Sequence, residues 1–277
     1  MAMAEVGYAL SSRIAGGVYV ASEEVINGTG QDYTTAYQAL RSNPASVTPA
    51  SLATGMITSY QAQYQGDPYG SDTFSTVVSS GFTQLISALS QFVTASDALG
   101  TADRTVLVSL ATGGTSLSFD VASFRDLGRF MTRVTSAIAL PQPVRTAATV
   151  VGNALAAMVT GKTNDQRGSS GMSIYLPTTN DSYLQSYAST ATAFCQATGW
   201  DRFARWLATG SRSSAVATVA VVPQARGIRA GTRPYDADSQ ALAFRWAAYG
   251  TLVQSSTDAT AGDQRAARAR VIRAVTP

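Results

Sequence analysis

Two of the three glutamates in this 277-residue sequence stand side by side, where they could do chemistry. Glu23 and Glu24 follow the apolar run 18–21 and precede the loop 27–30. A pair of carboxylates can act as general acid and base, or can bind a cationic side chain. Because side chains alternate across the end of a strand, we expect only one of the two to face a given pocket. The alternative is that both glutamates are solvated.

The sequence contains no histidine and a single cysteine, Cys195. A Ser-His-Asp or Cys-His arrangement needs an imidazole to accept the proton, so this sequence cannot supply one by itself. The same absence excludes a Cys/His zinc site, and one cysteine cannot form an internal disulfide. Cys195 follows Phe194 on an apolar helical stripe, where we expect a small core residue. We therefore expect no metal and no cofactor.

Two glycine-containing segments match chemical motifs only in part. Gly161-Lys162-Thr163 lacks the glycine five residues earlier that a phosphate-binding loop needs, so we expect the end of a helix there. Gly168-Ser169-Ser170-Gly171 does not have the Gly-x-Ser-x-Gly spacing of a nucleophile elbow. We expect a flexible loop at residues 164–171.

The composition indicates a folded domain with an uncharged polar surface. Hydrophobic residues make up 45% of the chain and charged residues 13%, below the roughly 25% of an average globular protein. The net charge of +3 comes almost wholly from arginine and is too small to predict nucleic-acid binding. No apolar run of about 18 residues predicts a membrane span. Glu5 lies where a signal peptide carries positive charge, so no export signal is visible.

Apolar periodicity predicts that helices alternate with two buried strands, at residues 18–21 and 172–177. Thr48 followed by Pro49 is a favourable N-cap and first turn. This alternation favours an α/β sheet covered by helices, with a helix-rich C-terminal part. The composition changes after Gly210, so we expect a domain at 1–210 and an unassigned segment at 211–277. The helices are expected at residues 2–14, 33–40, 52–64, 74–93, 104–140 with a break at 113–114, 144–159, and twice between 183 and 207.

A series of short motifs occurs in order along about residues 1–208: Met1 to Leu10, Ser22-Glu23-Glu24 with Gly28-Thr29-Gly30 and Tyr33, a tyrosine-containing helix from Leu52 to Tyr64, Asp126-Leu127, Gly171 to Pro177, and Thr198-Gly199-Trp200 with Phe203. In these motifs and their order the sequence resembles the clostripain family of cysteine peptidases. The family has a caspase-like α/β fold, so the resemblance implies a caspase-like sheet covered by helices. Gln31 departs from the family pattern, which has tryptophan after Gly-x-Gly.

The resemblance places the catalytic histidine and cysteine before Met1, with the cysteine about two residues upstream. It therefore implies that residues 1–210 are the C-terminal portion of a peptidase domain whose sheet is incomplete at its N-terminal side. We expect part of a bacterial cysteine endopeptidase that cleaves after arginine and is inactive without its missing N-terminal half. The resemblance suggests a secreted or cell-envelope protein, while the residues themselves leave the compartment open.

Three acidic residues are the candidate substrate-binding residues, Glu23, Glu24 and Asp32. In the family, the loop after this strand lies beside the nucleophile and helps to build the substrate pocket. An acidic side chain there would bind an arginine of a basic peptide or protein substrate. The alternative from another class is a non-catalytic caspase-like module that binds basic peptides or a protein partner. A hydrolase that uses carboxylates alone is a third reading.

Overall fold

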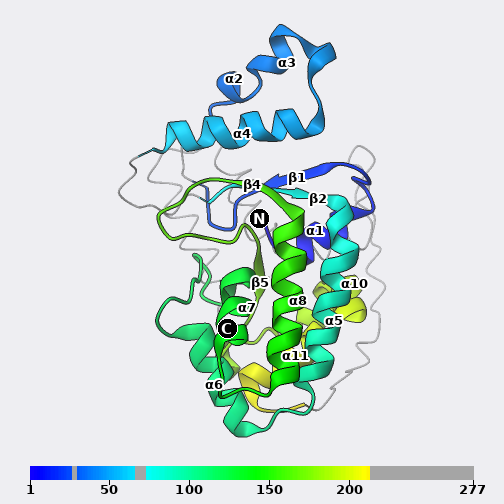
Figure 1. The fold of residues 1–277 in the computed structure, drawn as a ribbon, viewed down its shortest axis with the longest axis vertical. Coiled ribbons are helices and arrows are strands. Elements are labelled where there is room, and N and C mark those ends of the chain that lie inside the picture. Colours follow the sequence, from blue (N-terminus) through cyan, green and yellow to red (C-terminus); the bar gives the residue numbers. More distant parts are fainter. Residues whose placement is uncertain (27–29, 66–72, 213–277) are drawn as a thin grey trace, which may run out of the picture. The chain divides into compact units, whose positions relative to one another are not determined.

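The computed structural model describes residues 1–26, 30–65 and 73–212 (Figure 1). Among the described residues, those within 1–184 and 194–212 belong to one compact unit, and those within 185–193 belong to a second. The predicted loop at residues 27–29 and almost all of the unassigned segment 211–277 lie outside the described residues. The domain boundary near residue 210 therefore stays a prediction.

The first sheet has three antiparallel strands in the order β1-β2-β4. Strand β1 (Val18–Ala21) has the bounds predicted from the sequence, but it is only half-buried rather than buried. Strand β2 (Ser75–Val78) pairs with β1 on one side and with β4 (Val159–Lys162) on the other. Strand β2 is therefore the central strand, and both of its edges form hydrogen bonds to a neighbouring strand. Its β-branched residues suit this position.

Strands β2 and β4 correct two sequence predictions. The helix predicted from residue 74 begins only at Phe82, because Ser75–Val78 pair as a strand. The apolar residues Phe74 and Val78 fitted the helical spacing by coincidence. The predicted helix end at Gly161 is also wrong, since the helix stops at Met158 and Gly161 pairs with Thr76. Short apolar runs cannot be assigned to helix or strand from periodicity alone.

The second sheet pairs β3 (Phe124–Asp126) with β5 (Ser173–Tyr175) in antiparallel register. Strand β3 lies inside the segment for which the sequence predicted a helical pair, so that prediction is wrong over these three residues. An extended N-terminal segment links the two sheets. The Ala2 N–H donates to the Ser22 carbonyl at 2.7 Å, and the Ser173 N–H donates to the Ala2 carbonyl at 2.7 Å.

Helices make up most of the rest of the described chain (Figure 1). The Thr48 hydroxyl accepts from the Ser51 N–H at 3.1 Å, which confirms the predicted N-cap of α4. The helix predicted at residues 33–40 is two short helices. The helix bounds are α1 Ala4–Ser11, α2 Tyr33–Ala36, α3 Gln38–Ser42, α4 Pro49–Gln63, α5 Phe82–Ser96, α6 Thr101–Thr112, α7 Leu127–Ser136, α8 Gln142–Met158, α9 Tyr187–Thr190, α10 Thr192–Thr198 and α11 Trp200–Thr209.

Helices α5 and α8 run side by side, and α7 packs against α8 (Figure 1). Their facing residues are fully buried, among them Leu89 of α5 and Val151 of α8. Burying a side chain of this size contributes roughly 1.5–3 kcal/mol. The indole N–H of Trp200 donates to the Tyr175 carbonyl at 2.8 Å and ties α11 to β5.

The mixed α/β class predicted from the sequence is confirmed, with helices predominating over two small antiparallel sheets. Within the described residues, none of the helices combines the length and the hydropathy needed to cross a bilayer.

Candidate functional site

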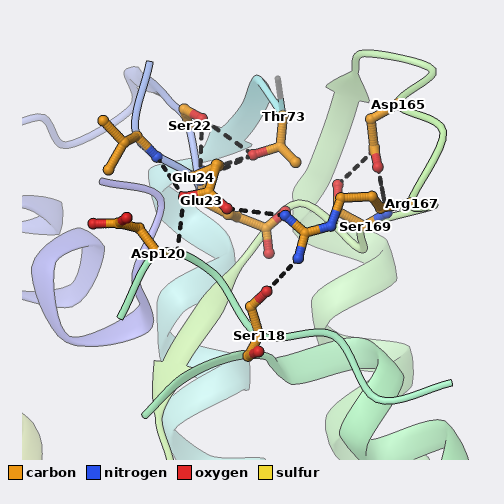
Figure 2. Close-up of polar contacts among 10 residues, drawn as sticks. Ser22, Glu23, Glu24, Thr73, Ser118, Asp120, Asp165, Arg167 and Ser169 are labelled. Carbon is orange, nitrogen blue, oxygen red and sulfur yellow. Dashed lines mark hydrogen bonds and ion pairs between the residues drawn. The ribbon is translucent and has the colours of Figure 1, made fainter. Parts of the chain in front are cut away.

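The two adjacent glutamates lie in a turn that Thr73 holds in place at the end of β1 (Figure 2). The Thr73 hydroxyl oxygen accepts from the Glu23 N–H at 2.9 Å and from the Glu24 N–H at 3.2 Å. It also lies 3.1 Å from the Ser22 hydroxyl. The backbone of the turn is therefore fixed by buried hydrogen bonds, and the two carboxyl groups point to different partners.

Glu23 is buried, with 1% of its surface exposed, and supports the loop that precedes β5. Its Oε2 accepts from the Gly171 N–H at 2.9 Å. Gly171 has φ +98°, and a Cβ there would lie 2.9 Å from Val159, so a larger residue would not fit at this contact. Burial, and then the nearby charge of Asp126, raise the pKa of Glu23 well above its ordinary value.

Asp126, the buried neighbour of Glu23, caps helix α7. Its Oδ1 accepts from the Arg129 N–H at 2.7 Å, and its Oδ2 accepts from the Ser170 N–H. Burial raises the pKa of Asp126, while the hydrogen bond from the Arg129 N–H opposes the rise. Asp126 accepts two backbone N–H groups and Glu23 accepts one, which favours the ionised form of Asp126 over that of Glu23.

Glu24 points to a different set of partners (Figure 2). Its Oε1 accepts from the backbone N–H groups of Val25 and Asp120, each at 2.9 Å. Its Oε2 accepts from Nη1 of Arg167 at 2.9 Å. The Glu24 side chain is only 10% exposed, so this ion pair is better shielded from water than a surface pair.

Arg167 makes three kinds of contact through its guanidinium group. One edge pairs with Glu24, and Nη2 donates to the Ser118 carbonyl (Figure 2). The guanidinium carbon lies 5.5 Å from the centroid of the Phe119 ring, in cation–π contact. Glu24, the Ser118 carbonyl and Phe119 therefore form a site that fits a guanidinium group, which we call the guanidinium site.

The loop that carries Arg167, residues 164–171 between β4 and β5, is held by several hydrogen bonds. Its predicted flexibility stays a prediction. Asp165 accepts from the N–H and the hydroxyl of Ser169, the latter at 2.7 Å. Arg129 donates to the Gly168 carbonyl at 3.1 Å and to the Arg167 carbonyl. Gly168 has φ +64°, which glycine adopts without strain.

Asp32 lies at the exposed start of α2 and has a local role as its N-cap. Its Oδ1 accepts from the Thr35 N–H at 3.2 Å, and its Oδ2 accepts from the Thr35 hydroxyl at 2.5 Å. These hydrogen bonds from Thr35 lower the pKa of Asp32. The structure thus places Glu23 and Glu24 against one loop and Asp32 on a helix cap.

Sequence reasoning missed Arg167, Phe119 and Arg129, because nothing in the local pattern relates them to the glutamates. Arg167 lies 143 residues from its partner Glu24. The sequence offered one indication that Arg167 has a specific role: charged residues are scarce in this chain, and Arg167 lies in a glycine-containing loop. Cys195 lies on α10 and is buried, as expected for a core residue.

Comparison with solved structures finds similarity to clostripain-type (C11) cysteine proteases, the class that the sequence motifs resemble. A secreted C11 protease from Bacteroides thetaiotaomicron, in complex with an irreversible peptide inhibitor, has 19% identity and a TM-score of 0.49, covering 73% of this chain and 56% of that one. An inactive C11 zymogen from Parabacteroides distasonis has 15% identity and a TM-score of 0.49, covering 72% of this chain and 56% of that one. A clostripain from Bacteroides thetaiotaomicron has 18% identity and a TM-score of 0.49, covering 72% of this chain and 82% of that one.

The chain spans about 56% of the length of the first two proteases. No protein-family model matches the sequence, and no curated protein matches it. These similarities concern the course of the backbone and assign no functional residue.

Proposed function

We propose that residues 1–210 form the substrate-pocket portion of a clostripain-like cysteine endopeptidase that cleaves after arginine. The catalytic histidine and cysteine are supplied by polypeptide outside this sequence, which has no histidine. Cys195 does not serve as the nucleophile, because it is buried on α10 with no histidine anywhere in the chain to activate it.

One observation carries this proposal. The N-terminal residues lie between the two sheets, where the Ala2 N–H donates to the Ser22 carbonyl at 2.7 Å. The family resemblance puts the nucleophile about two residues before Met1. The turn that holds Glu23 and Glu24 is therefore next to the position at which the nucleophile would enter, as a substrate pocket requires.

Among the three candidate residues, Glu24 is the best placed to bind an arginine side chain of the substrate. It already binds a guanidinium group, that of Arg167, at 2.9 Å. Glu23 supports the loop from the buried side through Gly171. Asp32, at the exposed start of α2, adds negative charge without a fixed contact to the substrate.

The test has two parts. The 277-residue chain, incubated with a fluorogenic arginyl peptide, should give no thiol-dependent turnover, and Cys195→Ser should change nothing. A longer protein, expressed from an upstream in-frame start that adds a His-Gly strand and a strand ending Asp-Ala-Cys, should hydrolyse the same peptide. Turnover by the 277-residue chain that survives Cys195→Ser contradicts the proposal, as does a folded longer protein with no arginyl activity.

A second candidate is a non-catalytic module that binds basic peptides. The observation that favours it is that the guanidinium site consists of this chain's own residues and needs no catalytic group. An in-frame stop codon immediately upstream of Met1 would select this candidate over the peptidase.

A further inference from the structure

We propose that Arg167 is an internal ligand, which occupies a site for the arginine side chain of another polypeptide and must leave before that arginine can bind. The inference rests on the proposed function for the identity of the ligand, an arginine-containing peptide. It adds that the chain, as it stands, has its arginine site closed by the loop 164–171.

The guanidinium site is more than an ordinary surface ion pair. Arg202 and Asp97 form such a pair at 2.9 Å, with 41% and 42% of their side chains exposed. The Glu24 carboxylate is 10% exposed and its partner Arg167 is 30% exposed. Taken together, a shielded carboxylate, a carbonyl acceptor and an aromatic ring match the charge, the donors and the flat face of a guanidinium group.

The site is preorganised independently of Arg167. The N–H groups of Val25 and Asp120 hold Oε1 of Glu24 from one side, each at 2.9 Å. If Arg167 leaves, this carboxylate keeps its orientation while Oε2 loses its cation. A shielded, unpaired carboxylate is costly, so the empty site attracts another cation. The ring and the carbonyl then favour arginine over lysine, which has a compact ammonium group.

The contacts of the loop allow Arg167 to move while its neighbours stay. The C-terminal end of the loop is anchored to buried carboxyl groups, through Ser170 to Asp126 and through Gly171 to Glu23. Gly168 separates these anchors from Arg167 and has φ +64°. A rearrangement of residues 165–168 that releases Arg167 therefore leaves these anchors in place but breaks the hydrogen bonds of Arg129 to the Arg167 and Gly168 carbonyls.

The experiment removes the internal ligand and offers a free one. N-acetyl-L-arginine N-methylamide and its lysine analogue are titrated into the full-length chain and into Arg167→Ala, with calorimetry as the readout. An occupant within the same chain competes at an effective concentration of about millimolar, so we expect Arg167→Ala to bind the arginine compound at least about tenfold more tightly than the unmodified chain. We expect the lysine compound to bind Arg167→Ala at least about tenfold more weakly than the arginine compound does.

Two further variants make the result specific. Glu24→Gln in the Arg167→Ala background should abolish the gain in arginine affinity. Arg202→Ala, which breaks the exposed pair with Asp97, should leave the affinity of the unmodified chain unchanged. Equal binding by the unmodified chain and Arg167→Ala, or retention of the gain in Glu24→Gln, overturns the proposal.

A measurement on the unmodified chain covers the case in which Arg167→Ala does not fold. Saturating arginine compound should increase the hydrogen exchange of residues 165–168, while the amides of Val25 and Asp120 stay protected. Unchanged exchange at 165–168 under saturation overturns the proposal. If Arg167→Ala binds the arginine compound but the longer protein cleaves no arginyl peptide, the peptidase proposal is wrong and the guanidinium site is supported. If the longer protein cleaves arginyl peptides equally well with Glu24→Gln, the guanidinium site is rejected as the arginine-binding site and the peptidase proposal is supported.

Discussion

The carboxyl groups of Glu23 and Asp126 lie near each other in the interior and hold consecutive residues of one loop. Gly171 donates its N–H to Glu23 at 2.9 Å, and Ser170 donates its N–H to Asp126. Asp126 also caps α7 through the Arg129 N–H. Two negative charges so close in a buried place repel each other, and this repulsion adds to the effect of burial in raising the pKa of Glu23. The end of β1, the loop before β5 and the start of α7 thus meet at one titrating pair.

This pair predicts how stability changes with pH. Burial and the charge of Asp126 raise the pKa of Glu23, so the folded state binds the proton more tightly than the unfolded state does. The stabilisation is complete below the ordinary value of 4.5 and is lost as the pH rises toward the higher pKa of the folded state. Each proton so linked contributes a slope of at most about 1.4 kcal/mol per pH unit. Glu23→Gln should flatten this slope and make the chain more stable than the unmodified protein at pH 8.

Urea denaturation of both proteins from pH 4 to 8 measures the effect. The contrasting variant is Asp32→Asn, which keeps the cap of α2 and removes a carboxyl whose pKa is lowered by Thr35. The stabilisation that ionised Asp32 contributes depends on pH in the opposite direction. It is present above the ordinary pKa of 3.8 and is lost as the pH falls. Parallel curves for Glu23→Gln and the unmodified protein would show that folding does not raise the pKa of Glu23.

Arg129 provides a second prediction, because it holds the backbone of the Arg167 loop. It donates to the Gly168 carbonyl at 3.1 Å and to the Thr115 carbonyl at 3.2 Å. Arg129→Ala should loosen residues 165–168 without removing Arg167 from the chain. We expect faster hydrogen exchange there and an arginine affinity between those of the unmodified chain and Arg167→Ala. An affinity no higher than that of the unmodified chain would show that the backbone contacts do not hold Arg167 in place.

Local chemistry was the part of the fold that the sequence could predict. The strand Val18–Ala21, which contains two valines and a tyrosine, and the Thr48-Pro49 helix start depend on neighbouring residues, and both have the bounds expected. Strand β2 could not be predicted, because Ser75–Val78 become a strand only through pairing with β1 and β4. Tertiary pairing overrode a helical pattern there.

For the candidate site, too, local features could be predicted from the sequence and contacts between distant segments could not. The pairing of the two glutamates was visible in the sequence, and alternation across the strand end anticipated that they would point to different partners. Their partners Gly171 and Arg167 come from a loop 148 and 143 residues away in the sequence. Only the fold brings that loop to the end of β1, so neither the raised pKa of Glu23 nor the occupied guanidinium site could be predicted from one sequence.

Arg104 gives a third prediction, on the stability of the last described helix. Its Nε donates to the carbonyls of Trp206 and Leu207 at 2.9 and 3.0 Å, and Nη2 donates to the Ala208 carbonyl at 2.9 Å. These carbonyls lie in the last turn of α11, where the Trp206 carbonyl also accepts from the Gly210 N–H at 2.8 Å. A cation there complements the helix dipole. Arg104→Ala should lower the free energy of unfolding by about 1.5–3 kcal/mol.

The matched control for Arg104 is Arg202→Ala, which loses the exposed pair with Asp97. That pair should contribute about 0–1 kcal/mol. Both variants are compared by the midpoint of urea denaturation at constant slope. Equal losses for the two would mean that the three carbonyl contacts of Arg104 contribute no more than a solvated ion pair does.

Two helical glycines give the last prediction, because the same substitution should have opposite effects at them. A Cβ on Gly7 of α1 would lie 2.2 Å from Cζ of Phe82, a ring that is 1% exposed at the start of α5. Gly7→Ala therefore forces a packed ring to shift and should destabilise the fold by about 1–3 kcal/mol. A Cβ on Gly152 of α8 meets no heavy atom within 4 Å, so Gly152→Ala should stabilise the fold by about 0.5–1 kcal/mol through helix propensity. Thermal and urea unfolding of the two variants measure both signs, and a Gly7→Ala protein as stable as Gly152→Ala would contradict the close packing of α1 against α5.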